Sequence, residues 1–292
     1  MADRRPRVGQ IDFLNCLPIA WGFHAIGADS SVELHADTPD VLSDMLVAGQ
    51  LDVAPISTVE ALNHADDLVV LPEVSVGADG PVLSVCLVGA PPEQLDGATV
   101  SLGSTSRTSV VLAQMLLERR WGVQPKYRSD PPDLPVMLSH ADAAVLIGDP
   151  ALSASLVEGP AQGWTVTDLA QAWREWTGLP MVFAVWAARR EFAQERGSEL
   201  ERLRQGLAGA VAHAAEHRTE VVAAAVARSG LPAPALEAYF AALQFGLDER
   251  QRAGLASFAQ SYANYKGVST PADLRILGPL TETPVTAGGS GI

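Results

Sequence analysis

Short apolar runs with polar ends alternate with helical patterns along the first two thirds of the chain. Residues 7–13 predict a first strand, and residues 39–49 predict a helix that ends at a glycine. Residues 51–57 predict a buried strand, and the polar pair Ser57 and Thr58 marks its end. Because strands alternate with helices, the pattern indicates an α/β fold with parallel strands.

A second copy of this strand-and-helix unit follows later in the chain. Residues 141–147 predict a strand, with Gly148 and Asp149 at its polar end. Two copies of one such unit indicate two α/β lobes of similar construction. Two further apolar strands, at residues 82–88 and 181–188, are bounded by Gly or Pro and would link the lobes. We therefore expect a two-lobed protein with a central cleft, a common place for a small ligand.

The order of these elements predicts how the chain divides. Since the chain leaves the first lobe and later returns to it, the first lobe is discontinuous, and we assign it residues 1–87 and 187–280. Residues 88–186 form the second lobe. The alanine-rich part near the C-terminus predicts amphipathic helices that pack on the first lobe. Residues 281–292 lack apolar periodicity, and we expect them to be disordered.

Composition narrows the class of protein. The chain has 292 residues, of which 48% are hydrophobic and 18% are charged, a globular composition. A net charge of −14 argues against nucleic-acid and anionic-membrane partners. No apolar run approaches the roughly 18 residues of a membrane span, and the N-terminal pattern lacks a secretory signal, so we expect a cytoplasmic protein. Cys16 and Cys86 are then expected to be free thiols.

A polar turn at residues 103–109 is the most informative local segment. It lies between a predicted strand and a predicted helix, and it contains Ser106, Arg107 and Thr108. Backbone N–H groups at a helix N-terminus are a ready site for a carboxylate or a phosphate, and an arginine can add a bidentate pair. An ordinary Ser/Thr N-cap would explain the same residues.

The strand ends supply further candidates for ligand contacts. Ser57 and Thr58 end one strand of the repeated unit, and Gly148 and Asp149 end the other. Open α/β sheets bind ligands at such ends, so both pairs are candidate binding residues. Capping of the helices that follow is the alternative role.

Other catalytic motifs are weak or missing. The chain has no Walker pattern and no G-x-S-x-G motif. Residues 213–217 spell H-A-A-E-H, the order of an inverted zinc-protease motif. A zinc site also needs a third ligand from a neighbouring element, and the surrounding alanine-rich helix offers none. We therefore predict no metal, and no motif indicates an organic cofactor or an oligomeric state.

Six motifs follow one another in a fixed order. They are VGQIDFLNCLP at 8–18, GQLDVAPIS at 49–57, STSRTS at 104–109, IGDPAL at 147–152, DLAQAW at 168–173 and TGLPMVFA at 177–184. Together they resemble the chorismate dehydratases of the futalosine pathway of menaquinone biosynthesis. The resemblance implies a fold similar to type II periplasmic-binding proteins. It also implies a hydro-lyase that converts chorismate, a dianion, to 3-[(1-carboxyvinyl)oxy]benzoate without metal or cofactor.

The same resemblance implies which residues act. The active-site asparagine of the family matches Asn15, and its active-site serine matches Ser84. Neither side chain is a base near pH 7, so we hypothesise that a carboxylate of the substrate takes the proton, with Asp149 as the rival base. Two other functions stay open: a 1,4-dihydroxy-6-naphthoate synthase, which has the same fold, and a non-catalytic solute-binding protein.

Overall fold

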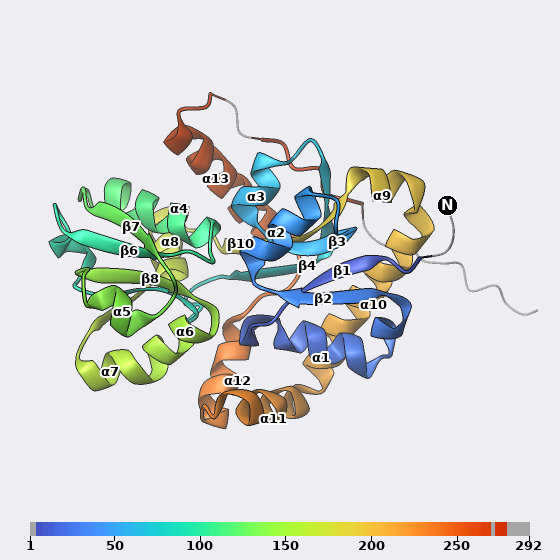
Figure 1. Cartoon of the computed structure of the whole chain (residues 1–292), viewed down its shortest axis with the longest axis horizontal. Coiled ribbons are helices and arrows are strands. Elements are labelled where there is room, and N and C mark those ends of the chain that lie inside the picture. Colours follow the sequence, from blue (N-terminus) through green and yellow to red (C-terminus); the bar gives the residue numbers. More distant parts are fainter. Residues whose placement is uncertain (1–3, 270–271, 279–292) are drawn as a thin grey trace, which may run out of the picture.

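Two five-stranded mixed sheets form the two lobes of the molecule (Figure 1). The computed structural model describes residues 4–269 and 272–278. The first sheet has the strand order β2-β1-β3-β10-β4, and the second has the order β7-β6-β8-β5-β9. The strands of the first sheet are β1 (Arg7–Ile11), β2 (Glu33–Asp37), β3 (Val53–Ser57), β4 (Leu68–Ala78) and β10 (Met181–Arg189). Those of the second are β5 (Val85–Gly89), β6 (Thr99–Gly103), β7 (Lys126–Asp130), β8 (Ala143–Ile147) and β9 (Thr165–Asp168).

Helices connect the strands and cover the faces of both sheets. In the first two thirds of the chain they are α1 (Leu17–Ala25), α2 (Pro39–Val47), α3 (Thr58–Asn63), α4 (Thr108–Met115), α5 (Leu134–Leu138), α6 (Gly148–Ser153), α7 (Gly159–Gln162) and α8 (Leu169–Thr177). The C-terminal helices are α9 (Arg190–Glu195), α10 (Gly197–Glu216), α11 (Arg218–Ser229), α12 (Ala233–Ala242) and α13 (Glu249–Lys266). Across the described residues, none of these helices has the length and apolar character of a membrane span.

The repeated unit predicted from the sequence is present in both sheets. In each lobe a buried strand runs directly into a short helix, β3 into α3 and β8 into α6. Each of these strands has one parallel neighbour, β1 beside β3 and β6 beside β8, and one antiparallel neighbour, β10 beside β3 and β5 beside β8. The carboxyl ends of parallel strands are where such sheets bind ligands, so this arrangement decides where the site lies.

The connection between the lobes differs from the prediction. The strand expected at 82–88 is β5, which lies wholly within the second sheet, between β8 and β9. The strand expected at 181–188 is β10, which lies inside the first sheet between β3 and β4. Each strand is apolar because side chains on both of its faces are buried. The chain instead crosses between the sheets in the neighbouring segments 79–84 and 169–180.

Strand β10 also changes the assignment of residues to lobes. Because β10 pairs with β3 and β4, residues 181–186 belong to the first sheet, although the sequence placed them in the second lobe. The predicted disordered tail, 281–292, lies outside the described residues.

The C-terminal helices do not all stay with the first lobe. Helix α10 lies against α1 so closely that a Cβ on Gly22 would be 2.1 Å from the Ala210 carbonyl oxygen. Helix α13 also contacts the second lobe, because the Arg119 guanidinium donates to the Asn264 carbonyl oxygen at 3.1 Å. The Tyr265 hydroxyl lies 3.1 Å from Glu118 Oε1. This helix therefore spans the two lobes (Figure 1).

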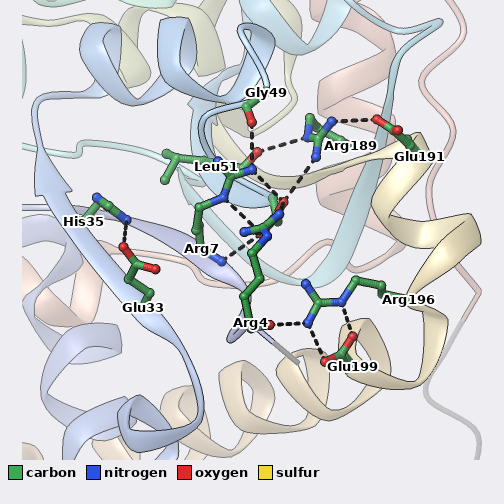
Figure 2. Close-up of polar contacts among 11 residues, drawn as sticks. Arg4, Arg7, Glu33, His35, Gly49, Leu51, Arg189, Glu191, Arg196 and Glu199 are labelled. Atoms are coloured by element: carbon green, nitrogen blue, oxygen red, sulfur yellow. Dashed lines mark hydrogen bonds and ion pairs between the residues drawn. The ribbon is translucent and has the colours of Figure 1, made fainter. Parts of the chain in front are cut away.

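A buried carboxylate fixes the N-terminal edge of the first lobe. The side chain of Asp52 is fully buried and accepts hydrogen bonds from Arg4, Arg7 and Arg189 at 3.0 to 3.4 Å. Figure 2 shows these three arginines converging from β1 and β10 and from the chain before β1. Burial raises the pKa of Asp52, but the arginine hydrogen bonds outweigh burial and hold it well below its usual value. The cluster joins β1, β3 and β10.

Candidate functional site

The main candidate site is a cavity between the two lobes that is partly open to solvent. The first lobe lines it with the ends of β1 and β3, the start of α2 and part of β10. The second lobe lines it with the polar turn before α4 and the end of β8. Six of the candidate residues from the sequence line this cavity: Asn15, Ser57, Ser106, Arg107, Thr108 and Gly148. Three do not: Ser84, Thr58 and Asp149.

Asn15 lies in a short 3₁₀ turn, Leu14–Cys16, between β1 and α1. Its Oδ1 atom is buried and has no hydrogen-bond partner among the described residues. An unpaired buried polar atom in a cavity is costly, and a ligand that donates to it would remove that cost. Asn15 therefore has the environment expected of a ligand-contacting residue.

Asp149 holds this turn from the opposite lobe. Its Oδ1 accepts the Leu14 N–H at 2.7 Å, and its Oδ2 lies 3.5 Å from the Arg228 guanidinium. Burial raises the pKa of Asp149, while the Leu14 hydrogen bond and the Arg228 charge act in the opposite direction. Because the carboxylate is engaged and lies outside the cavity lining, its geometry favours positioning of the Asn15 turn over proton abstraction.

Arg107 joins the lobes and does not project as a free cation. Its guanidinium lies 2.7 Å from Asp44 on α2 and 3.0 Å from Glu60 on α3. Burial lowers the pKa of Arg107, but the two carboxylates outweigh burial and raise it, so the side chain stays charged. It is also the single Lys or Arg among the described residues that line the cavity. If Arg107 binds a carboxylate of a ligand, as expected from the sequence, it does so while it is paired with Asp44 and Glu60.

The serine hydroxyl groups near the cavity mainly accept backbone N–H groups at the starts of helices. The Ser57 hydroxyl accepts the Glu60 N–H at 3.3 Å, which caps α3. The Ser106 hydroxyl accepts the Ser109 N–H at 3.2 Å. These bonds match the capping alternative for both serines, and both side chains still line the cavity.

The hydroxyl groups of Thr108 and Thr58 form buried hydrogen bonds to the backbone, one between the lobes and one within the first lobe. The Thr108 hydroxyl accepts the Val59 N–H at 3.0 Å, a bond between the lobes. The Thr58 hydroxyl donates to the Val182 carbonyl oxygen at 2.7 Å and is fully buried. Thr58 is thus committed to the first sheet, which explains why it does not line the cavity.

Ser84 lies behind the cavity wall, next to two residues that line it. Its side chain is 1% exposed, and its Oγ has no hydrogen-bond partner of good geometry among the described residues. Its carbonyl oxygen accepts the Gly148 N–H at 2.8 Å, and Val85 follows it in the chain. Gly148 has φ of +63°, and a Cβ there would lie 2.8 Å from the Phe13 ring. Glycine is therefore required where Phe13 of the first lobe meets the second.

The comparisons with known proteins agree with this architecture. A family described as menaquinone biosynthesis matches residues 6–264. The chain belongs to this family. It is 33% identical over 272 residues to a chorismate dehydratase of Thermus thermophilus, covering 88% of this chain and 95% of that protein. The family resemblance predicted from the six motifs is thereby confirmed.

Solved structures support the fold of this member of the menaquinone biosynthesis family. A protein of Archaeoglobus fulgidus superposes with a TM-score of 0.71 at 20% identity, covering 90% of this chain and 98% of that one. The periplasmic aliphatic sulphonate binding protein of Escherichia coli gives 0.66 at 20% identity, covering 95% and 93%. These likenesses confirm the predicted periplasmic-binding-protein-like fold.

Two polar residues at or near the cavity were not predicted from the sequence. Asp40, in the first turn of α2, lines the cavity, and its Oδ1 is buried without a partner among the described residues. Tyr239 of α12 is fully buried, and its hydroxyl faces Ser84. Burial raises the pKa of Tyr239, and the interaction with Ser84 opposes that shift. Neither residue lies in a recognisable motif, since only the fold brings α2 and α12 to the site.

The cysteines and the H-A-A-E-H motif lie outside the cavity lining. Both cysteines are buried free thiols, as predicted, and burial raises the pKa of Cys86 to about 12. The ligand atoms of His213, Glu216 and His217 lie within 4.8 Å of one another at the end of α10. Both imidazoles pack against Trp21, with ring centroids 5.6 and 6.0 Å away. This packing gives the histidines a structural role on the helix surface.

Proposed function

We propose that the protein is a chorismate dehydratase, a hydro-lyase that eliminates water from chorismate. The observation that carries the proposal is the interlobe cavity, where the unpaired Asn15 amide oxygen and the Arg107 turn share one lining. The identity of 33% to a curated chorismate dehydratase, spread over most of both chains, supports the same activity. A small cyclic dicarboxylate is the kind of ligand that suits a mainly apolar lining with a few polar groups and one arginine.

Binding of a dianion by a protein of net charge −14 requires local attraction. The start of α4 supplies it, because the first N–H groups of a helix carry partial positive charge. Arg107 adds a full charge, and its guanidinium has five N–H donors, of which only part is used by Asp44 and Glu60. A substrate carboxylate can therefore join Arg107 while its bridge between the lobes persists.

The reaction breaks the C3–H and C4–O bonds and forms the C3–C4 double bond that completes an aromatic ring. The product's aromaticity drives the elimination, so the protein's task is positioning and charge stabilisation. In our hypothesis a carboxylate of the bound substrate takes the C3 proton and passes it to the C4 hydroxyl, which departs as water while the C3–H electron pair forms the new C3–C4 double bond. Asn15 holds the enolpyruvyl group from the cavity lining. Ser84 lies behind the cavity wall, so its contact with the leaving hydroxyl requires the wall at Val85 and Gly148 to shift when the substrate binds. Asp149 is a poor rival base, because it accepts the Leu14 N–H and lies outside the cavity lining.

The finer placement follows the family resemblance. We place the reaction in the futalosine pathway of menaquinone biosynthesis and in the cytoplasm. The two alternatives stay distinguishable: a solute-binding protein would hold chorismate without changing it, and a 1,4-dihydroxy-6-naphthoate synthase would act on another substrate.

A direct test mixes the purified protein with chorismate and follows the products by ultraviolet absorbance and liquid chromatography. We expect chorismate to be replaced by an aromatic carboxyvinyloxy-benzoate. Asn15→Asp places a negative charge beside the dianion and should lower kcat/KM by about 100-fold or more. Asn264→Asp makes the same change on exposed α13 and should leave kcat/KM unchanged. Chorismate recovered intact from wild-type protein would refute the proposal.

A further inference from the structure

The backbone just before Ser84 adopts a rare conformation. Leu83 has φ of +61°, and it is the one non-glycine residue in the described part of the chain with a positive φ. The Ser84 N–H donates to the Val82 carbonyl oxygen at 2.7 Å, which closes a γ-turn centred on Leu83. With positive φ at its centre this is the strained form of the turn, and an L-residue adopts it only when its surroundings enforce it.

One buried carboxylate enforces the turn from the amide side. Asp168 Oδ2 accepts the Val82 N–H at 2.8 Å and the Leu83 N–H at 2.6 Å. Its Oδ1 accepts the Ala170 N–H at 2.9 Å and the Gln171 N–H at 3.0 Å, which caps α8. The two oxygens therefore have separate tasks: one caps a helix, and the other holds two consecutive amides in the geometry that the turn needs.

The carbonyl side of the turn is held as well. Ser155 Oγ donates to the Leu83 carbonyl oxygen at 2.7 Å, and the Gly148 N–H donates to the Ser84 carbonyl oxygen at 2.8 Å. In contrast to this bonded backbone, the Ser84 Oγ is buried with no partner of good geometry in the described part of the chain. The Tyr239 hydroxyl faces this Oγ, and strain with extensive backbone bonding around such a buried hydroxyl is typical of a residue held in place for function.

We propose that Asp168 is a positioning residue for Ser84. By accepting the Val82 and Leu83 N–H groups it keeps Leu83 left-handed, and this fixes the direction of the Ser84 hydroxyl behind the cavity wall. The inference rests on the proposed function, because it takes Ser84 as a residue of the dehydratase site. It adds that the strained turn, and not the serine alone, sets the rate.

The test uses glycine, which adopts positive φ without strain. Asp168→Asn replaces one acceptor oxygen by an amide donor and should lower kcat by about 100-fold, with KM within about threefold of wild type. Adding Leu83→Gly should restore kcat to within about tenfold of wild type, because glycine at this position needs no carboxylate to hold the turn. Adding Leu83→Ala instead removes the same leucine side chain but keeps a Cβ, so kcat should stay low.

A structural readout separates this inference from the proposed function. In crystals of Asp168→Asn we expect Leu83 to leave the left-handed region, and in Asp168→Asn with Leu83→Gly we expect φ at position 83 to stay positive. Leu83 that keeps φ near +61° in Asp168→Asn would overturn the inference, whether or not the protein turns over chorismate. Equal kcat for the glycine and alanine double variants would also overturn it.

A milder variant covers the case in which Asp168→Asn fails to fold. Ser155→Ala removes one hydrogen bond to the turn and leaves the α8 cap intact, so kcat should fall several-fold. Leu83→Gly should reverse that loss and Leu83→Ala should not. Ser155→Ala with wild-type kcat and unchanged φ at Leu83 would contradict the inference.

Discussion

The contact between Phe13 and Gly148 allows a quantitative test of lobe closure. Gly148→Ala has two effects: backbone strain at residue 148 itself and overlap of the new Cβ with the Phe13 ring. Alanine at φ of +63° costs about 1 kcal/mol of backbone strain. The new Cβ would also lie 2.8, 2.9 and 3.1 Å from three atoms of the Phe13 ring, where ordinary contacts begin near 3.4 Å. Overpacking of this kind costs about 1 to 3 kcal/mol.

The strain and the overlap are separable because Phe13 and Gly148 belong to different lobes. The chain can relieve the overlap by opening the cleft, and then the overlap destabilises only the closed state. Backbone strain is present in both states. A penalty of about 1 to 3 kcal/mol on the closed state lowers kcat/KM by about 5-fold to 150-fold, if closure precedes the reaction.

Gly163→Ala is the matched control. Gly163 lies in the same lobe at φ of +68°, and a Cβ there would meet nothing within 4 Å. Urea unfolding of both variants should give the same loss, about 1 kcal/mol, while chorismate turnover should fall only in Gly148→Ala. Equal kcat/KM for the two variants would refute the reasoning and would mean that Phe13 and Gly148 are not in contact in the reacting state.

Three further predictions concern single side chains. Asp40→Asn removes a like charge from the cavity wall, so KM should fall several-fold with kcat within about threefold; a loss of kcat above about 100-fold in a folded variant would make Asp40 the base. Tyr239→Phe removes the hydroxyl facing Ser84 and should lower kcat about tenfold, whereas Tyr262→Phe, on α13, should not; equal rates would exclude Tyr239 from the site. Asp52→Asn should cost about 3 kcal/mol of unfolding free energy at pH 7, since it leaves buried arginine bonds unmade. Because the pKa of Asp52 is depressed in the folded protein, its contribution to stability is present above about pH 4 and is lost as the pH falls further. The difference in unfolding free energy between wild type and Asp52→Asn, measured in urea, should therefore shrink in acid. A difference that stays constant with pH would contradict this.

Local signals in the sequence predicted local structure well. The repeated strand-and-helix unit, the cap at Ser57 and the polar turn around Arg107 are all present where the pattern placed them. These features depend on interactions between residues close together in the chain, and such interactions are predictable from hydrophobic periodicity and capping preferences.

Contacts between distant segments were not predictable in the same way. Arg107 has a sequence environment typical of an anion site, yet it pairs with Asp44 and Glu60 of the other lobe. The apolar sequence of β10 fits a strand that links two lobes as well as a strand inside a sheet. Only the observed pairing places it between β3 and β4. The positive φ of Leu83 depends on hydrogen bonds to Asp168, a distant residue, and residue propensities do not predict such a contact.

The position of β10 has a consequence for synthesis on the ribosome. The second sheet has all its strands once residue 168 has emerged, but the first sheet lacks an interior strand until residue 189. Until then β3 and β4 expose unpaired edges, although they were made earlier. The later-made lobe is therefore the one that can complete its sheet first, and it can do so while β3 and β4 of the first lobe still lack the strand that pairs with both.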